Sequence, residues 1–317
     1  MTTRHLVDPE ILPLLDILPA IDFSIGLDLI RDQIAQYPLP QTAVAIEPEI
    51  RHAPGRGGAP DVPLHLYNPP GSGKGRAALL YMHGGGMVLG SADMARSSLP
   101  DLAMAHDAVG VSVEYRLAPE TTFPGPQEDC YAALAWLVDH SEELGVDPRR
   151  IILLGESAGG AMAAALAIMV RDRGDYSLAG QILTFPMLDH RTGGEKDVWK
   201  NPMTGEFVWT GAANQFGWTS MRGDYGADDK RKGWFSPSLA DDLSRLPPTF
   251  IAVGSLDLFL DENLDYARRL IAAGVPVDLD LYAGAPHAFG LVATADVTRR
   301  LRAGVAAAVE RFVRRSA

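Results

Sequence analysis

The stretch "IILLGESAGGAMAAALAIMV", residues 151–170, decides the fold of this chain. It begins with an apolar, β-branched run typical of a buried strand and continues as an alanine-rich run typical of a helix. Between them lies Gly155-Glu156-Ser157-Ala158-Gly159, a G-x-S-x-G pattern. In this context the pattern predicts a sharp turn that strains Ser157 and exposes its hydroxyl, with the flanking glycines removing side chains that would collide. Ser157 is therefore a candidate nucleophile, and a purely structural turn is the alternative.

A serine nucleophile needs a base, normally a histidine oriented by a carboxylate. Two histidines follow Ser157 in the sequence, His190 and His287. His287 lies in "LYAGAPHAFG", residues 281–290, a loop that leaves the last apolar run and enters the final helix. His190 opens a long insertion, and we interpret it as a solvated loop residue. We predict that His287 is the base.

The carboxylate is expected between the serine and the histidine in chain order. Asp257 follows the apolar run 249–254 and precedes a helical pattern. Asp261 and Glu262 fit the first turn of that helix, where the helix dipole favours acidic groups. We predict that Asp257 orients His287, and a simple helix cap is the alternative.

Three adjacent glycines follow an earlier apolar run, in "YMHGGGMVLG" at residues 81–90. Attack on a carbonyl by Ser157 would place negative charge on oxygen, which backbone N–H groups stabilise strongly. Bare backbone at Gly84, Gly85 and Gly86 would allow close approach, and the N–H of Ala158 would add a donor. We predict an oxyanion hole from these four residues. We expect His83 to hold the loop by hydrogen bonds and not to act as a base.

Eight short apolar runs recur along the chain, at about 43–50, 62–69, 77–83, 110–116, 151–156, 180–187, 249–254 and 277–282. From the third onward they alternate with helical patterns, which predicts a mostly parallel α/β sheet with helices on both faces. The first two runs favour an antiparallel hairpin at one edge. Residues 1–40 and 189–236 fall outside this rhythm, and the second segment holds four of the five tryptophans. These tryptophans indicate an apolar pocket wall or the segment's own small core.

Composition limits the partners. The formal net charge of −12 disfavours nucleic acid and anionic membranes. No signal peptide or membrane-length apolar run is present, so the sequence predicts a cytoplasmic protein with no membrane partner. The single cysteine, Cys130, sits in a helical pattern and is interpreted as a core residue. No histidine pair has metal-ligand spacing, so no metal is expected.

Taken together, these blocks resemble the hormone-sensitive-lipase-like branch of the α/β-hydrolases, which includes bacterial carboxylesterases. The resemblance rests on "HGGG" at 83–86, "YRLAPE" at 115–120, "GESAGG" at 155–160, "LPPTFIAVGSLDLFLDENLDYARRL" at 246–270 and "YAGAPHAF" at 282–289. It implies an eight-stranded sheet, no cofactor and a helical cap. The cap would comprise residues 1–40 and 189–236, and the core would comprise residues 41–188 and 237–317. Two departures are Glu156, where Asp or Thr is more usual, and Ala288, where Gly is common.

The resemblance implies hydrolysis of short- to medium-chain carboxylic esters, with a small-molecule ester as the substrate. An amidase or deformylase would use the same three residues, and spacing does not distinguish it. A non-catalytic small-molecule binder on the same fold is a further alternative, disfavoured because Ser157, Asp257 and His287 are all present. An interfacial lipase is less expected, since no long amphipathic surface helix stands out. A homodimer through the last strand is compatible with the sequence, which does not decide it.

Overall fold

The computed structural model describes residues 2–18, 20–36, 46–71, 73–226 and 228–315. The strands in this part of the chain are β1 (Glu49–Ala53), β2 (Val62–Tyr67), β3 (Arg76–Met82), β4 (Ala108–Val113), β5 (Val146–Glu156), β6 (Gly180–Thr184), β7 (Thr249–Gly254) and β8 (Val277–Tyr282). The α-helices are α1 (Leu12–Ile17), α2 (Leu27–Ala35), α3 (Leu99–Ala105), α4 (Gly125–Asp139), α5 (Ser141–Leu144), α6 (Ala158–Arg173), α7 (Gly211–Met221), α8 (Lys232–Phe235), α9 (Leu260–Ala272) and α10 (Asp296–Arg315).

The described strands form one eight-stranded sheet in the order β1-β2-β4-β3-β5-β6-β7-β8. Strand β2 runs antiparallel to both of its neighbours, and the pairs from β4 to β8 are parallel. This confirms the mostly parallel sheet and the antiparallel hairpin at its edge. The first predicted strand was misplaced, because β1 begins at Glu49; residues 43–45 of that prediction lie outside the described part of the chain.

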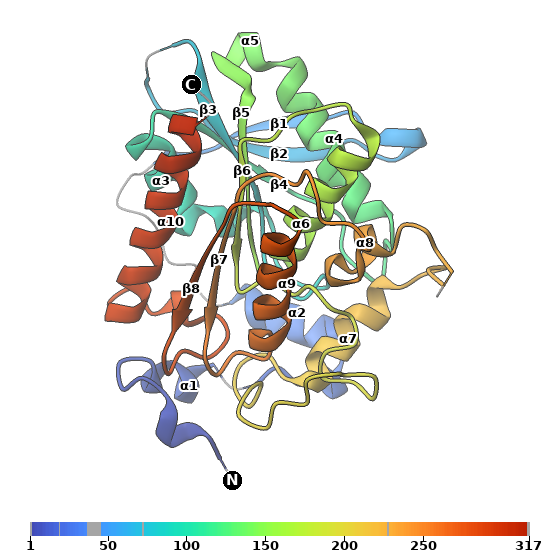
Figure 1. Cartoon of the computed structure of the whole chain (residues 1–317), viewed down its shortest axis with the longest axis vertical. Helices are drawn as coiled ribbons and strands as arrows, with labels where there is room; N and C mark the ends of the chain where they lie inside the picture. Colours follow the sequence, from blue (N-terminus) through green and yellow to red (C-terminus); the bar gives the residue numbers. More distant parts are fainter. Residues whose placement is uncertain (1, 19, 37–45, 72, 227, 316–317) are drawn as a thin grey trace.

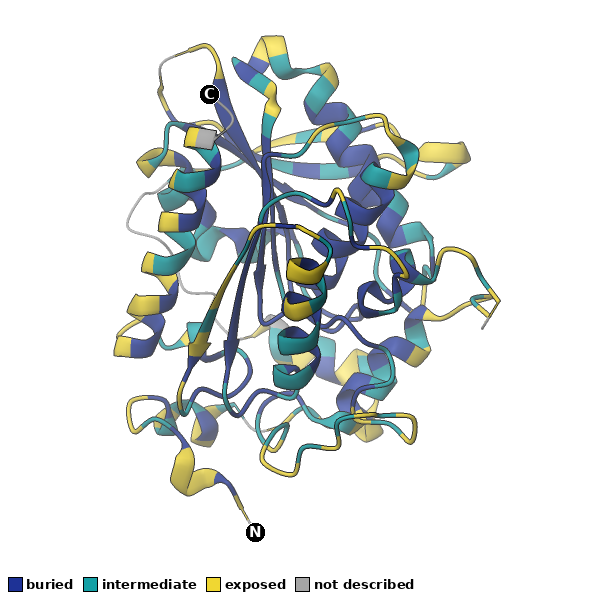
Figure 2. Ribbon diagram, in the orientation of Figure 1, coloured by how far each residue is buried: buried dark blue, intermediate teal, exposed yellow. Residues whose placement is uncertain are grey.

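Helices cover both faces of the sheet, with α3 and α10 on one side and α4, α6 and α9 on the other (Figure 1). Strand β3 shows why the sequence produces two cores. Ala78, Leu80 and Met82 belong to the core under α4 and α6, whereas Leu79 and Tyr81 belong to the core under α10. Successive side chains of a strand point to opposite faces, so a strand covered on both sides is apolar throughout. Strands β3, β4, β6 and β7 are accordingly buried along their length, as is the second half of β5 up to Gly155 (Figure 2).

The N-terminal segment and the insertion 189–236 meet at the edge of the sheet where the parallel strands end (Figure 1). The ring of Phe23 stacks on Phe216 of α7 with centroids 4.2 Å apart, and the N–H of Ile21 donates to the carbonyl of Val208 at 3.1 Å. The N-terminal segment forms the short helices α1 and α2, and Pro13 occupies the first turn of α1. The division of the chain into cap and core at residues 40, 188 and 236 stays a prediction.

Two smaller predictions concern single elements. Cys130 is fully buried on α4 and has a free thiol, which confirms it as a core residue. Among the described helices, none is both long enough and apolar enough to cross a bilayer.

Candidate active site

The turn between β5 and α6 holds Ser157 in an unusual backbone conformation. Its φ is 56° and its ψ is −118°, a region that costs a non-glycine residue about 1–3 kcal/mol. A Cβ atom at Gly155 would lie 2.1 Å from the carbonyl oxygen of Gly159, and one at Gly159 would lie 2.1 Å from that of Met82. Both flanking glycines are therefore required for the turn to close, as the sequence predicts.

The structure brings Ser157, His287 and Asp257 together from three loops. The Oγ atom of Ser157 lies 2.9 Å from Nε2 of His287, and Nδ1 of His287 lies 2.8 Å from Oδ2 of Asp257. All three side chains are buried. Because a carboxylate faces Nδ1, that nitrogen carries the proton, and Nε2 is left to accept the proton of the serine hydroxyl.

The loops that carry Asp257 and His287 are joined to each other. The N–H of Leu256 donates to the carbonyl of Ala285 at 3.0 Å, and the N–H of Gly284 donates to Oγ of Ser255 at 2.9 Å. Asp257 is held further because its Oδ1 accepts from the N–H of Phe259 at 2.9 Å. Strands β7 and β8 are paired neighbours, so their following loops start side by side.

Aromatic edges fix the imidazole ring of His287. Phe185 and Phe259 contact it with ring centroids 5.0 and 5.1 Å away, at angles of 69° and 90°. The next residue, Ala288, has a φ of 58°. Glycine tolerates this left-handed conformation, whereas alanine adopts it at a cost of about 1 kcal/mol, which gives a physical reason for the glycine that the family resemblance implies at this position.

The three glycines after β3, here called the glycine turn (Gly84, Gly85 and Gly86), run beside the nucleophile. A Cβ atom at Gly84 would lie 3.2 Å from the carbonyl oxygen of Glu156 and 3.6 Å from Cβ of Ser157. At Gly85 a Cβ atom would lie 2.1 Å from the carbonyl oxygen of Leu89. In the described part of the chain, the backbone N–H groups of the glycine turn and of Ala158 donate to no protein acceptor. Their role as an oxyanion hole stays a prediction.

His83 supports the glycine turn from beneath. Its Nδ1 lies 2.8 Å from the carbonyl oxygen of Gly84, and its ring stacks on Tyr115 at 4.1 Å. The hydroxyl of Tyr115 donates to the carbonyl of His83 at 2.6 Å. The prediction that His83 holds the loop by hydrogen bonds is confirmed. Burial lowers the pKa of His83 to about 4, so the ring is neutral near pH 7.

Acidification is expected to lower the free energy of unfolding of the wild-type protein more than that of a His83→Asn variant. Between pH 6.5 and about 4 the unfolded chain binds a proton that the buried His83 excludes. The free energy of unfolding therefore falls with pH over this window, by up to about 3 kcal/mol from this group. Urea denaturation at pH 7, 6, 5 and 4 checks this: the stability advantage of the wild type over the variant should shrink toward pH 4. A constant difference would contradict it.

His190 lies in a turn, as predicted, but the prediction that it is solvated is wrong. Instead of a solvated loop residue, it is half-buried among the rings of Trp218, Tyr225 and Phe235. The insertion folds back on itself there and needs apolar packing of its own. Burial lowers the pKa of His190.

The tryptophans of the insertion divide between the two expected roles. Trp218 packs on Phe235 within the insertion, and Nε1 of Trp234 donates to Asp172 of α6 at 2.8 Å. Trp209 lies instead against the glycine turn, since a Cβ atom at Gly86 would be 2.0 Å from its Cη2. Only Trp209 of these three is placed to bound the space beside the glycine turn.

Sequence reasoning missed the role of Glu262. Its Oε1 accepts from the N–H of Leu188 at 2.5 Å and of Asp189 at 3.3 Å, and its Oε2 accepts from the hydroxyl of Thr192. Glu262 is buried, and burial raises the pKa of its carboxyl well above its usual range, with a further contribution from Asp189. It does lie in the first turn of α9, as predicted, but it ties the start of the insertion to α9. Nothing local in the sequence identifies partners about 70 residues away.

Arg31 of α2 is a second anchor that the sequence did not reveal. Its guanidinium donates to the carbonyls of Val88 and Ala118, each at 3.0 Å, and pairs with Glu120 at 2.6 Å. Val88 follows the glycine turn, so this contact fastens the N-terminal segment to the loop that carries the turn.

Glu156 occupies the position before the nucleophile and is half-buried. Burial raises the pKa of its carboxyl, whereas Arg302 of α10 acts in the opposite direction.

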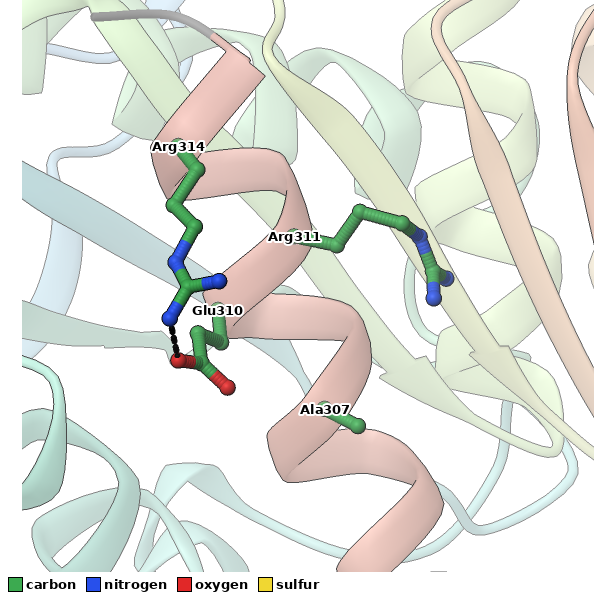
Figure 3. A pocket seen from close by; sticks show the side chains of 4 residues that line it. All are labelled: Ala307, Glu310, Arg311 and Arg314. Carbon is green, nitrogen blue, oxygen red and sulfur yellow. Dashed lines mark hydrogen bonds and ion pairs between the residues drawn. The ribbon is translucent and has the colours of Figure 1, made fainter.

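A separate hollow on α10, lined by Ala307, Glu310, Arg311 and Arg314, contains the ion pair between Glu310 and Arg314 (Figure 3). It shares no residue with the candidate active site.

Comparison with known proteins agrees with this geometry. Residues 79–291, more than half of the chain, match the model of a family described as alpha/beta hydrolase fold. The chain belongs to this alpha/beta hydrolase family. The match confirms the resemblance to hormone-sensitive-lipase-like carboxylesterases, and the sheet confirms the fold that the resemblance implies.

Relatives of this hydrolase carry esterase names. It is 34% identical over 280 residues to carboxylesterase NlhH of Mycobacterium tuberculosis, covering 86% of this chain and 85% of that protein. It is 31% identical over 281 residues to esterase LipI of the same organism, covering 86% and 84%. Among solved structures, one described as bacterial heroin esterase superposes with a TM-score of 0.88 at 35% identity, covering 98% of this chain and 99% of that one.

Proposed function

We propose that this hydrolase cleaves small, neutral carboxylic esters through an acyl-enzyme formed on Ser157. The observation that carries the proposal is the pair of hydrogen-bond contacts from Oγ of Ser157 through His287 to Asp257. Beside them lie backbone N–H groups that have no acceptor in the described part of the chain. The family and the esterase names of its relatives support carboxylic ester hydrolysis as the reaction class.

The first half of the reaction forms the acyl-enzyme. Oγ of Ser157 attacks the ester carbonyl carbon as Nε2 of His287 takes the hydroxyl proton. The carbonyl oxygen becomes negative and accepts hydrogen bonds from N–H groups of the glycine turn and of Ala158. When the intermediate collapses, the alcohol leaves with the proton that His287 held, and the acyl group remains on Ser157.

Water completes the cycle. His287 removes a proton from water, the resulting nucleophile attacks the acyl carbon, and the same N–H groups stabilise the new oxyanion. Ser157 leaves with the proton from His287, and the carboxylic acid is released. Asp257 stays ionised throughout and stabilises the imidazolium that forms twice in each cycle. No step needs a cofactor.

The walls near the glycine turn support a preference for short acyl chains. Trp209 lies against Gly86. The ring of Phe23 contacts the indole of Trp209 edge to face, with centroids 6.0 Å apart. Phe216 extends this apolar surface by stacking on Phe23. We propose that the acyl chain lies against this aromatic surface, which would limit its length.

Hydrolysis of p-nitrophenyl esters from two to sixteen acyl carbons tests the substrate class. We expect kcat/KM to be highest for acyl chains of two to six carbons and to fall at least tenfold by sixteen carbons. The matching p-nitroanilides, measured beside the esters, should react far more slowly. A maximum at the longest chains would contradict the size limit. Faster anilide hydrolysis would favour the amidase alternative, and tight binding without hydrolysis would favour the binding-protein alternative.

Other features of the proposal rest on the sequence. The cytoplasmic location, the lack of nucleic-acid and membrane partners and the homodimer remain predictions. The cap formed by residues 1–40 and 189–236 is likewise proposed, and the contacts between Phe23 and Phe216 support it.

A further inference from the structure

Helix α7 of the insertion touches the glycine turn through a residue that has no side chain. A Cβ atom at Gly217 would lie 2.4 Å from the carbonyl oxygen of Gly86 and 3.5 Å from Cε of Met187. Gly217 lies inside α7 and is buried, in a position where glycine costs a helix about 1 kcal/mol relative to alanine. The contact gives a reason for that cost, since only glycine lets the helix backbone reach the Gly86 peptide.

A second residue of the same insertion also contacts Gly86. The indole of Trp209 occupies the place where a Gly86 side chain would point. Its Nε1 donates to Oδ1 of Asn214 on α7 at 3.3 Å, so the ring and the helix are held together. Gly86 is thus contacted by both Trp209 and Gly217.

Helix α7 is itself anchored to the part of the core that carries Asp257. Asn214 donates to the carbonyl of Thr192 at 2.8 Å, and Gln215 donates to the same carbonyl at 3.0 Å. The hydroxyl of Thr192 donates to Glu262 on α9, the helix that starts just after Asp257. A series of hydrogen bonds therefore links the helix over the glycine turn to the loop of the proposed catalytic acid.

Met187, the second neighbour of Gly217, belongs to the same arrangement. Its N–H donates to the carbonyl of Ser157 at 3.0 Å, and its side chain is fully buried. Gly217 consequently lies between the peptide of Gly86 and a residue bonded to the backbone of the nucleophile. A Cβ atom at position 217 would meet Met187 at an ordinary contact distance, but it would clash with the carbonyl oxygen of Gly86 and so displace that peptide or push α7 away.

We propose that Gly217 is a positioning residue that allows α7 to fix the Gly86 peptide and, through it, the oxyanion-binding N–H groups. Such donors stabilise the oxyanion only within about 2.7–3.1 Å of its oxygen, and removal of one donor lowers kcat by about 10²–10³-fold. A Cβ atom at Gly217 forces a displacement of several tenths of an ångström or more. The inference rests on the proposed ester hydrolysis and extends it to a residue that touches no substrate.

The test compares Gly217→Ala with Gly226→Ala, a change in the same insertion where an added Cβ atom meets nothing within 4 Å. For p-nitrophenyl butyrate we expect Gly217→Ala to lower kcat at least tenfold and to change KM less than threefold. Inactivation by a p-nitrophenyl alkylphosphonate, which forms a tetrahedral adduct on serine, should slow by a similar factor. Gly226→Ala should match the wild type in both measurements.

Thermal unfolding of each variant separates misplacement from loss of fold. A folded Gly217→Ala protein with wild-type kcat, a loss confined to KM, or an equal loss in Gly226→Ala would overturn the inference. If Gly217→Ala does not fold, Trp209→Phe decides, with Trp234→Phe as its control. Trp209→Phe removes part of the contact with Gly86 and should lower kcat, whereas Trp234→Phe should not. Equal kcat values in the two variants overturn the inference. If the wild type itself hydrolyses no ester, the proposed function fails and not this inference alone.

Discussion

Replacing Ser157 with alanine is expected to lower kcat for p-nitrophenyl butyrate by about 10⁶-fold, to the level set by the remaining site and water. Among the residues that the structure describes, only Ser157 brings a hydroxyl within hydrogen-bonding distance of Nε2 of His287, at 2.9 Å. The variant should fold normally, since alanine accepts the same turn at the same backbone cost. The phosphonate that inactivates the wild type should leave the variant unlabelled by mass spectrometry.

Ser112→Ala is the matched control for this result. Ser112 is also a buried serine, and it lies on β4, away from the candidate active site. Its hydroxyl donates to the carbonyl of Ala92 at 2.9 Å. Loss of that hydrogen bond should cost about 1 kcal/mol of stability and leave kcat within a factor of two. A Ser157→Ala protein that keeps more than about 1% of the wild-type kcat would place the nucleophile elsewhere.

Replacing Asp257 with asparagine is expected to lower kcat by about 10⁴-fold with the geometry of the site retained. One oxygen of Asp257 accepts from the N–H of Phe259, and the other faces Nδ1 of His287. Asparagine has a single oxygen, which the Phe259 N–H claims, so its NH₂ group turns toward His287. The imidazole then carries its proton on Nε2 and cannot accept the proton of Ser157.

Asp261→Asn controls for the loss of a negative charge near this loop. Asp261 lies in the first turn of α9 and accepts from Nδ2 of Asn201 at 2.8 Å. Its replacement should leave kcat within about threefold of the wild type. Similar losses in the two variants would mean that general electrostatics, and not the tautomer of His287, governs the rate. A loss below tenfold in Asp257→Asn would remove Asp257 from the proposed mechanism.

Local pattern predicted the strands well where apolar runs are bounded by glycine, proline or charge. Strands β2 to β8 fall on predicted runs. Strands β3, β4, β6 and β7 are apolar because both of their faces are covered, and the exposed edge strand β8 still alternates apolar and polar residues. The first run was misplaced because β1 exposes most of its residues at the edge of the sheet. Its sequence, EIRHA, therefore shows little alternation of apolar and polar residues. His190 was misjudged for the converse reason, since its aromatic partners are brought to it by the fold of the insertion.

The sequence by itself determined the glycine-containing turns and the order of the three proposed catalytic residues, because both depend on the local backbone. The glycines around Ser157 and those at 84–86 are dictated by turns that no side chain fits, and the order of Ser157, Asp257 and His287 follows the order of the strands. Only the tertiary structure decided that Glu262 ties the insertion to α9 and that Gly217 admits α7 to the Gly86 peptide. Those contacts join residues about 70 and about 130 positions apart, and their distances depend on how whole elements pack rather than on any neighbouring residue.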